Sequence, residues 1–367
     1  MEVPFVDLKK QYLSIKDEID RAVNNVIMDA AFIGGKYVKA FESNFADFVG
    51  SKYCIGVGNG TDALFIAMKS LGIGAGDEVV TVANSFIATS EAITMTGARV
   101  VFVDCDDRTY NMDVNKIEGV ISKKTRAIIP VHLYGQPADM SVIMDIAKKY
   151  SLFVIEDAAQ AHGAQYRNKN IGTFGVCGCF SFFPGKNLGA YGDAGAIVTD
   201  DEELARKVRM HANHGRMEKY NHEFEGVNSR LDGLQAAILD VKLKHLDNWT
   251  QRRRAIANMY DEGLREAVIV PGFLPDVRHV YHLYVVRIKN RDRAKMLLEE
   301  RGVSTGIHYP IPLPFLKAYG YLEHTPDDFP VLYYLKDEIL SLPIHGDMTD
   351  EQVSYVIEQV KDVAKKI

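Results

Sequence analysis

The sequence predicts an α/β protein with a mainly parallel central sheet and a smaller C-terminal α+β domain. Two observations favour this fold: short apolar runs alternate with helix-like segments up to about residue 200, and the alternation ends near residue 249. Apolar runs of this length, separated by helices, are typical of parallel strands buried on both faces. Strand-like runs occur at Tyr53–Val57, Glu78–Val82, Arg99–Val103, Ala127–Val131, Phe153–Glu156, Cys177–Phe183 and Gly195–Thr199.

Helical spacing accounts for many of the segments between and after these strands. Apolar residues recur at helix spacing from Leu231 to Arg254, so we expect one long helix there that leads into a second domain. We therefore divide the chain into a large domain, residues 1–248, and a small domain, residues 249–367. The other helices are expected at Thr61–Leu71, Ile87–Thr96, Met140–Tyr150, Leu204–Met210, Arg293–Arg301 and Asp350–Lys366, with a further strand at Tyr281–Ile288.

Composition excludes several classes of protein. The chain has 367 residues, of which 47% are hydrophobic and 25% charged, as in ordinary globular proteins. A net charge of −6 provides no basic surface for nucleic acid. No apolar stretch is long enough to span a membrane, and the start of the chain lacks the pattern of a signal peptide, so we expect a cytoplasmic protein. No metal site is predicted, and we expect buried free thiols at Cys54, Cys105, Cys177 and Cys179.

Two residues at predicted strand ends form a chemically meaningful pair. Lys186 follows the apolar run Cys177–Phe183, and Asp157 follows the strand Phe153–Glu156. A lone lysine or aspartate in such a place is usually a turn residue or a helix cap. Here the apolar surroundings favour a low-dielectric site in which the lysine becomes nucleophilic. Pyridoxal phosphate needs this pair, because a lysine amine binds its aldehyde and a carboxylate keeps its ring nitrogen protonated.

A phosphate site is predicted where a glycine-rich turn enters a helix. The turn Val57-Gly58-Asn59-Gly60 precedes Thr61 and Asp62, and helix N-termini bind anions through unpaired N–H groups. The alternative is a tight turn in which Thr61 or Asp62 caps the helix. Ser181, near the end of the lysine strand, would add a hydroxyl group to the same phosphate. Phe86 follows another strand and either stacks on the cofactor ring or packs in the core.

Several motifs together resemble the DegT/DnrJ/EryC1/StrS group of sugar aminotransferases, which are pyridoxal phosphate enzymes of the aspartate-aminotransferase fold (fold type I). The resemblance covers nearly the whole chain. Its first motif looks like an N-terminal anchor, and the others match the family's cofactor pocket in order and spacing. The motifs are Pro4–Leu8, Gly60–Leu64, Glu156–Gly163, Phe180–Gly189, Gly192–Gly195 and Asn228–Asp232.

The resemblance implies a role for each matching residue. Lys186 would bind the cofactor covalently and Asp157 would pair with its ring nitrogen. A homodimer with shared active sites is implied as well, because Asn228 resembles a residue that reaches the phosphate in the neighbouring subunit. The remaining cofactor contacts implied are Gln160 at the ring oxygen, Phe86 as the stacking ring, and Gly60, Thr61 and Ser181 at the phosphate, with Asp62 beside them.

The same resemblance implies transamination. Relatives that dehydrate sugars carry histidine at the position of Lys186, so the lysine favours amination. L-glutamate would donate the amino group, the cofactor would cycle through pyridoxamine phosphate, and a nucleotide-diphosphate ketosugar would accept it. Donor and cationic groups at the pocket edge are the candidates for binding this sugar. They are His162, Tyr191, Asn228, Arg230, His308 and Tyr309.

The residues around Lys186 are most similar to those of enzymes that aminate C3 of a dTDP-linked sugar. We therefore expect conversion of a dTDP-3-keto-6-deoxyhexose into a dTDP-3-amino-3,6-dideoxyhexose. The alternatives within the family are a UDP-linked 3-keto-uronic acid and a 4-keto sugar. The alternative from another class is a sensor that binds pyridoxal phosphate without turnover, although no DNA-binding module accompanies the motifs.

Overall fold

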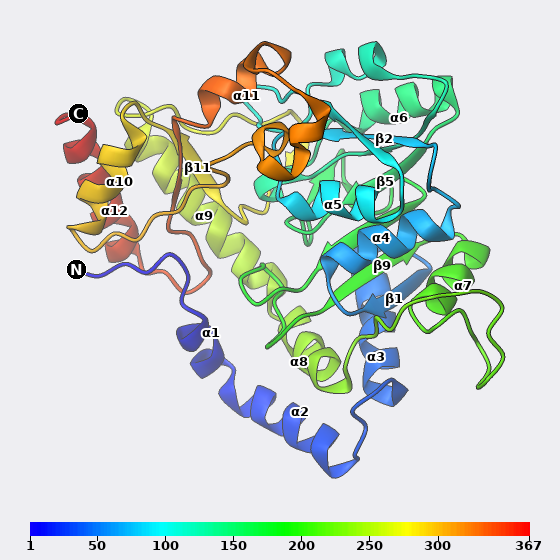
Figure 1. Ribbon diagram of the computed structural model, residues 1–367. Helices are drawn as coiled ribbons and strands as arrows, with labels where there is room; N and C mark the ends of the chain where they lie inside the picture. The colour runs from blue at the N-terminus through cyan, green and yellow to red at the C-terminus, as the bar shows by residue number, and fades with distance from the viewer.

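A seven-stranded sheet forms the centre of the protein in the computed structural model, which describes residues 1–367 (Figure 1). Its strand order is β1-β9-β8-β5-β4-β2-β3. The five strands from β8 to β3 are parallel, whereas β9 pairs antiparallel with both β8 and β1. The strands are β1 (Tyr53–Val57), β2 (Glu78–Val82), β3 (Arg99–Val103), β4 (Thr125–Ile129), β5 (Phe153–Asp157), β8 (Cys177–Ser181) and β9 (Gly195–Thr199).

All seven strands were predicted from their apolar runs, and the fold class is confirmed. Four have the predicted bounds. The other three differ at their ends: β4 lies two residues earlier, β5 extends to Asp157, and β8 stops at Ser181. The end of β8 differs because Phe182 continues the apolar run into the following turn, where it is fully buried. The predicted end, Phe183, is 58% exposed, so the apolar run extends past both the strand and the buried segment.

Helices cover the sheet, which explains why its strands are buried. Every residue of β9 is buried, and so are four of the five residues of β2. Helix α4 packs against β8 and β9, α3 against β1, and α6 against β5. The helices of this part are α3 (Gly35–Val49), α4 (Gly60–Ser70), α5 (Ile87–Met95), α6 (Met140–Tyr150), α7 (Glu202–His211) and α8 (Gly233–Leu243).

The long helix predicted from Leu231 to Arg254 is two helices. Helix α8 ends at Leu243, and α9 (Leu246–Leu264) begins three residues later. The prediction of one helix was wrong because hydrophobic spacing continues across the break, while the two helices pack on different partners. Helix α8 packs on α2 and α3, whereas α9 packs on α12 of the C-terminal part.

A second apolar cluster lies in the C-terminal part. It runs from Ile256 to Val363 and includes Val3, whose backbone pairs with Val303. Residues of the segment from Leu313 to Ile339 instead pack into the larger apolar cluster, which surrounds the central sheet. The predicted boundary between the two domains, at residue 248, falls inside α9 and stays a prediction. The elements here are α10 (Arg291–Glu299), α11 (Pro330–Leu335), α12 (Asp350–Ala364), β11 (Tyr284–Arg287) and β12 (Ile339–Leu342), the last two forming an antiparallel pair.

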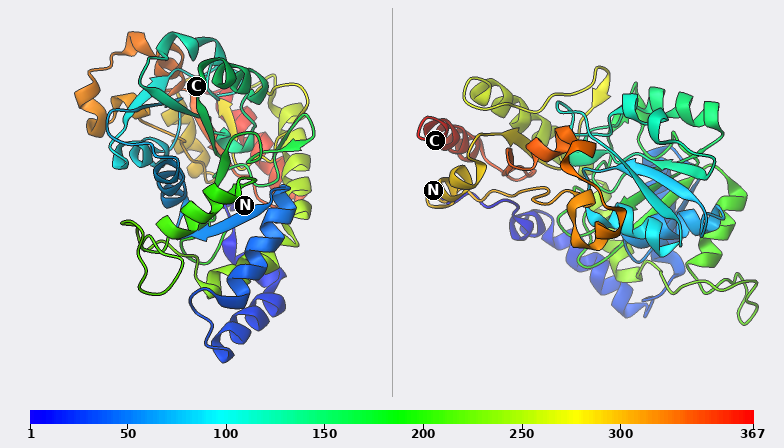
Figure 2. Two further views of the ribbon diagram at one scale, coloured as in Figure 1. Left: turned by 90° about the vertical axis from the view of Figure 1, so that its right-hand side faces the viewer. Right: turned by 45° about the horizontal axis from the view of Figure 1, so that its top comes forward.

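Two segments project from the body of the protein (Figures 1 and 2). One is the N-terminal arm of α1 (Leu8–Ser14) and α2 (Lys16–Met28), and the other follows α7. A small sheet joins β6 (Gln165–Tyr166), β7 (Lys169–Asn170) and β10 (Val277–Arg278). The short 3₁₀ helices are Val114–Lys116, Glu118–Val120, Leu133–Gly135, Leu313–Phe315, Lys317–Leu322 and Pro326–Asp328.

The four cysteines are free and buried, as predicted. None of the helices combines the length and the apolar character that crossing a bilayer requires.

Candidate active site

Asp157 and Lys186 come together at the carboxyl edge of the sheet. Strand β5 pairs in parallel with β8, with Asp157 opposite Cys179. Both strands end at this edge, β5 at Asp157 and β8 at Ser181, and the turn after Ser181 carries Lys186. Ligands of α/β sheets gather at such edges.

Asp157 is a buried carboxylate held by two hydrogen bonds. Its side chain accepts from the Thr89 hydroxyl at 2.7 Å and from the Ala159 backbone N–H at 3.2 Å. Burial raises the pKa of Asp157, although both hydrogen bonds and the nearby charge of Lys186 oppose this shift. The carboxylate is therefore a fixed acceptor that a positively charged group would stabilise. Sequence reasoning missed Thr89, because only the fold brings α5 to the end of β5.

Lys186 presents an amine without a partner. The side chain is partly exposed, and its Nζ has no hydrogen bond and no carboxylate within 4 Å. Burial lowers the pKa of Lys186 to about 8, while the charge of Asp157 opposes the shift. Near neutral pH the amine is therefore able to exist in both protonation states. A group that both reacts as a nucleophile and transfers protons needs this property.

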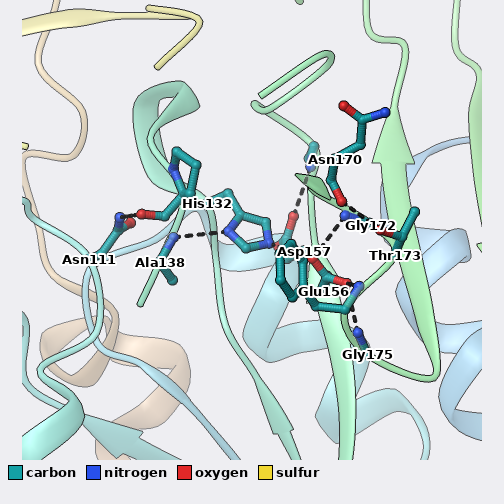
Figure 3. A network of polar contacts seen from close by, with 12 residues as sticks. Asn111, His132, Ala138, Glu156, Asp157, Asn170, Gly172, Thr173 and Gly175 are labelled. Atoms are coloured by element: carbon teal, nitrogen blue, oxygen red, sulfur yellow. Dashed lines mark hydrogen bonds and ion pairs between the residues drawn. The ribbon is translucent and has the colours of Figure 1, made fainter. Parts of the chain in front are cut away.

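A buried network holds the backbone around Asp157 (Figure 3). Glu156 accepts from His132 Nε2 at 3.1 Å and from the N–H groups of Gly172, Phe174 and Gly175 at 2.7–2.8 Å. The other ring nitrogen of His132 accepts from the Ala138 N–H, so the proton lies on Nε2 and the ring is neutral. With its acceptors occupied in this way, Glu156 fixes the strand end from which Asp157 projects.

The N-terminus of α4 forms a close-fitting cradle. The N–H groups of Gly60 and Thr61 have no acceptor, as is usual in the first helical turn. A Cβ atom on Gly60 would lie 2.6 Å from the Cβ of Ser181, so only glycine allows this approach. The Asn59 side chain caps the helix by accepting from the Asp62 N–H. The cap is therefore Asn59, and neither Thr61 nor Asp62 has the capping role considered from the sequence.

Asp62 does not present a free side chain to this cradle. Its carboxylate accepts from the Ser229 hydroxyl at 2.6 Å, and the same hydroxyl accepts from the Gly58 N–H at 2.9 Å. Asp62 thus ties the segment around Ser229 to the glycine turn. Because a carboxylate repels phosphate, we assign it this bracing role. Its backbone N–H is already bound to Asn59, so the free donors of the helix end are those of Gly60 and Thr61.

Aromatic and amide side chains line the other side of the site. The Phe86 ring is 53% exposed and lies 5.7 Å from the Tyr309 ring, so Phe86 is not a core residue. Gln160 accepts from the Tyr134 N–H at 2.6 Å and donates to the Tyr309 hydroxyl at 3.3 Å. Burial raises the pKa of Tyr309, which keeps this hydroxyl neutral. Phe86 lies near Asp157 because it immediately precedes α5, one turn before Thr89, and Gln160 lies near Asp157 because it follows it by three residues.

Three histidines surround Lys186, but they differ in accessibility. His308 stacks on Phe5, and its Nδ1 lies 2.8 Å from the Ser341 hydroxyl. His162 is fully buried against Phe180 and Phe182, so it does not lie at the pocket edge where the sequence placed it. Burial, assisted by the charge of Lys186, lowers the pKa of His162 to about 3 and that of His308 to about 4.

His282 is the third histidine, and sequence reasoning missed it. Its Nδ1 lies 3.3 Å from the Oδ1 of Asn187, the residue after Lys186. Asn187 also donates to the Val280 carbonyl oxygen at 3.1 Å. Burial lowers the pKa of His282 well below its usual value. No local signal identified it, because it lies at the start of a predicted strand, 95 residues after Asn187 in the chain.

The remaining predicted residues lie on the surface. Asn228 and Arg230 are exposed on either side of the buried Ser229, at the base of the segment that follows α7, where Asn228 forms a backbone bridge with Asn213. Tyr191 is 39% exposed beside the N-terminal arm, where its ring lies 6.2 Å from that of Tyr12. The structure thus does not bring these three into the group around Asp157.

The site fits pyridoxal phosphate. It combines a lysine amine without a partner, a buried carboxylate able to hold a ring N–H⁺, a helix N-terminus with free N–H groups, and a glycine that brings Ser181 close to that helix end. The residues of the chain alone provide each of these features.

Comparison with known proteins agrees with this geometry. Residues 13–361 match the model of the DegT/DnrJ/EryC1/StrS aminotransferase family. The chain is 46% identical to a pleiotropic regulatory protein of Geobacillus stearothermophilus over 366 residues, covering 99% of this chain and 98% of the other. It is 48% identical to the dTDP-3-amino-3,6-dideoxy-alpha-D-galactopyranose transaminase of Aneurinibacillus thermoaerophilus over 359 residues, covering 98% of each.

A solved structure shares the whole fold. The crystal structure of S. venezuelae DesV superposes with a TM-score of 0.98 at 41% identity, covering 100% of this chain and 99% of that one. Agreement over the full length extends to every element that builds the site. The chain therefore belongs to the DegT/DnrJ/EryC1/StrS aminotransferase family.

Proposed function

We propose that the protein transfers an amino group from L-glutamate to C3 of a dTDP-linked 3-keto-6-deoxyhexose. It is a pyridoxal-phosphate-dependent sugar aminotransferase, and its substrates are nucleotide-linked sugars. The observation that carries the proposal is the unpartnered Lys186 amine beside the buried Asp157, next to the anion cradle of α4. The choice of C3 and of dTDP is supported by the residues around Lys186 and by the similarity to a dTDP-sugar transaminase.

The mechanism divides between cofactor and protein. The bound cofactor supplies a ring that withdraws electrons from the carbon that loses a proton. Asp157 would keep the ring nitrogen protonated, and Thr89 and the Ala159 N–H hold the carboxylate in position. Gly60, Thr61 and Ser181 would hold the phosphate, and Phe86 and Gln160 would contact the ring. Lys186 acts as base when a proton leaves the donor carbon and as acid when it is returned.

The acceptor pocket is proposed to use the groups at the outer edge. His308 and Tyr309 lie beside Gln160, and their neutral side chains offer hydrogen bonds to sugar hydroxyl groups. Arg230 supplies a cation for the nucleotide diphosphate. His162 would act through the packing of Phe180 and Phe182, because its ring has no exposed surface.

Purified protein loaded with pyridoxal phosphate should lose its visible absorption band when L-glutamate is added and regain it with one ketosugar. The dTDP-3-keto-6-deoxyhexose should restore the band, and mass spectrometry with NMR should show a 3-amino product. A 4-amino product, or turnover of a UDP-linked uronate alone, would replace the proposed acceptor. A band that responds to no donor and no acceptor would point to a sensor.

We also propose that the active form is a homodimer in which Asn228 serves the neighbouring site. The exposed side chain of Asn228, which is accessible to a second subunit, supports this arrangement. Asn228→Asp should reduce activity strongly, because it places a carboxylate near the bound phosphate. Mixing this variant with Lys186→Ala should then restore activity, to about a quarter of the wild-type level if subunits exchange at random, since mixed dimers contain one intact site.

The complementation requires that each variant alone is folded and dimeric, which light scattering shows. If both variants are dimers and the mixture stays inactive after subunit exchange, Asn228 serves its own subunit. A wild-type protein that is monomeric and fully active would contradict the dimer itself.

A further inference from the structure

Lys242 is a buried ammonium group without a carboxylate partner. Its side chain has 0% exposure, and it lies on the inner side of α8. Its Nζ donates to the carbonyl oxygen of Gly189 at 2.6 Å and lies 4.3 Å from the centre of the Tyr191 ring. Burial lowers the pKa of Lys242 to about 8. Burying an unpaired cation is unfavourable, so its contacts merit a functional explanation.

Both contacts of Lys242 lie in the turn that carries Lys186. Gly189 follows Lys186 by three positions and Tyr191 by five. Gln235, seven residues before Lys242 and so on the same face of α8, holds this turn too. Its side chain accepts from the Tyr191 N–H at 2.8 Å and donates to the Tyr191 carbonyl oxygen at 3.4 Å.

The turn is tight, so movement of one part affects the rest. The N–H of Lys186 donates to the Phe183 carbonyl oxygen at 2.8 Å, and that of Ala190 to Phe182 at 2.7 Å. A Cβ atom on Gly189 would lie 2.3 Å from the carbonyl oxygen of Pro184. Because α8 is packed on α2 and α3, it provides a fixed support for this turn.

We propose that Lys242 and Gln235 form a clamp on α8 that positions the Lys186 amine. This inference rests on the role proposed for Lys186. Lys242 is a positioning residue: it contacts the backbone and the aromatic ring of the turn, while Lys186 performs the chemistry. The ammonium group suits this task because it donates strongly to a carbonyl and also attracts a ring face.

The test compares Lys242→Met, which lacks the donor, with Lys242→Arg, which keeps it. In Lys242→Met, kcat should fall about 10- to 100-fold while KM changes little, because the amine is displaced from its reacting position. Amide hydrogen exchange in residues 183–192 should become faster, and the pH midpoint of the visible absorption band should shift. Lys242→Arg should recover part of kcat and of the exchange protection. Lys244→Met, at the exposed end of α8, is the matched control and should behave as wild type.

The clamp would be overturned if Lys242→Met kept the wild-type kcat, hydrogen exchange and absorption midpoint. It would also be overturned if both Lys242 variants lost kcat equally while hydrogen exchange in the turn did not become faster. If Lys242→Met does not fold, Gln235→Ala carries the test, with the same expected changes and the same overturning result. Borohydride trapping of the cofactor in the wild type separates the clamp hypothesis from the role proposed for Lys186. Trapping at Lys186 with an unaffected Lys242→Met refutes only the clamp, whereas trapping at another lysine refutes the role of Lys186.

Discussion

Replacing Lys186 with alanine should remove covalent cofactor binding and lower the amination rate by at least about 10³-fold. General acid–base catalysis alone contributes about 10²- to 10⁴-fold, and this variant also loses the group that binds the aldehyde. The wild-type protein should show a visible absorption band, and borohydride should fix the cofactor to the peptide that contains Lys186. Both signals should be absent from the variant. Its fold should persist, because the amine makes no hydrogen bond or ion pair whose loss would weaken the protein.

Lys244→Ala is the control for this experiment, since Lys244 is an exposed lysine. It should keep the band, the trapped peptide and the rate. Lys186→Arg retains a positive charge and should be as inactive as the alanine variant, which separates amine chemistry from charge. Cofactor fixed to a different lysine in the wild type, or near-normal turnover by a folded Lys186→Ala, would contradict the assignment.

Asp157→Asn should lower activity by about 10²- to 10³-fold, the range seen when one strong electrostatic contact is removed from an active site. The amide is similar in size to the carboxylate and is able to accept from Thr89, so the pocket should keep its shape. It carries no charge, however, and does not keep the cofactor's ring nitrogen protonated. The measurement is kcat for both half-reactions, together with the absorption spectrum of the bound cofactor.

Although Asp157→Asn should lower activity, it should raise the stability of the cofactor-free protein at pH 7. Burial raises the pKa of Asp157 in the folded state above its unfolded value of about 3.9. A group of this kind favours folding most at low pH, and that contribution is lost as the pH rises through the folded-state pKa. At pH 7 the ionised carboxylate therefore destabilises the cofactor-free fold, and Asp157→Asn should have the higher Tm. The difference should vanish as the pH falls towards 4.

Asp145→Asn is the matched control, because Asp145 is exposed on α6. It should change neither the rate nor the pH dependence of Tm. A cofactor-free Asp157→Asn that is less stable than wild type at pH 7 would show that the hydrogen bonds of the carboxylate outweigh its burial. Unchanged turnover would remove Asp157 from the mechanism.

Features of this protein that depend on residues close together in the sequence were predictable, and features that depend on contacts between distant segments were not. The seven central strands follow from local apolar runs, because a strand buried on both faces needs hydrophobic residues at nearly every position. The break between α8 and α9 does not, since hydrophobic spacing continues across Lys244 and His245 while the helices turn to different partners. The same limit explains the overextended end of β8, where buried Phe182 lies in a turn.

The sequence by itself determined the fold class, the two strands that lead to Asp157 and Lys186, and the family, because these depend on local apolar runs and short motifs. The tertiary structure alone decided which side chains meet there. It placed Thr89 on Asp157, His282 beside Asn187, Ser229 on Asp62 and Lys242 on Gly189, and it buried His162. Each of these contacts joins segments more than 50 residues apart or depends on burial. Hydrogen-bond partners and solvent exposure depend on how distant segments pack together. Local hydrophobicity and spacing are compatible with more than one such packing, so they do not identify the partners.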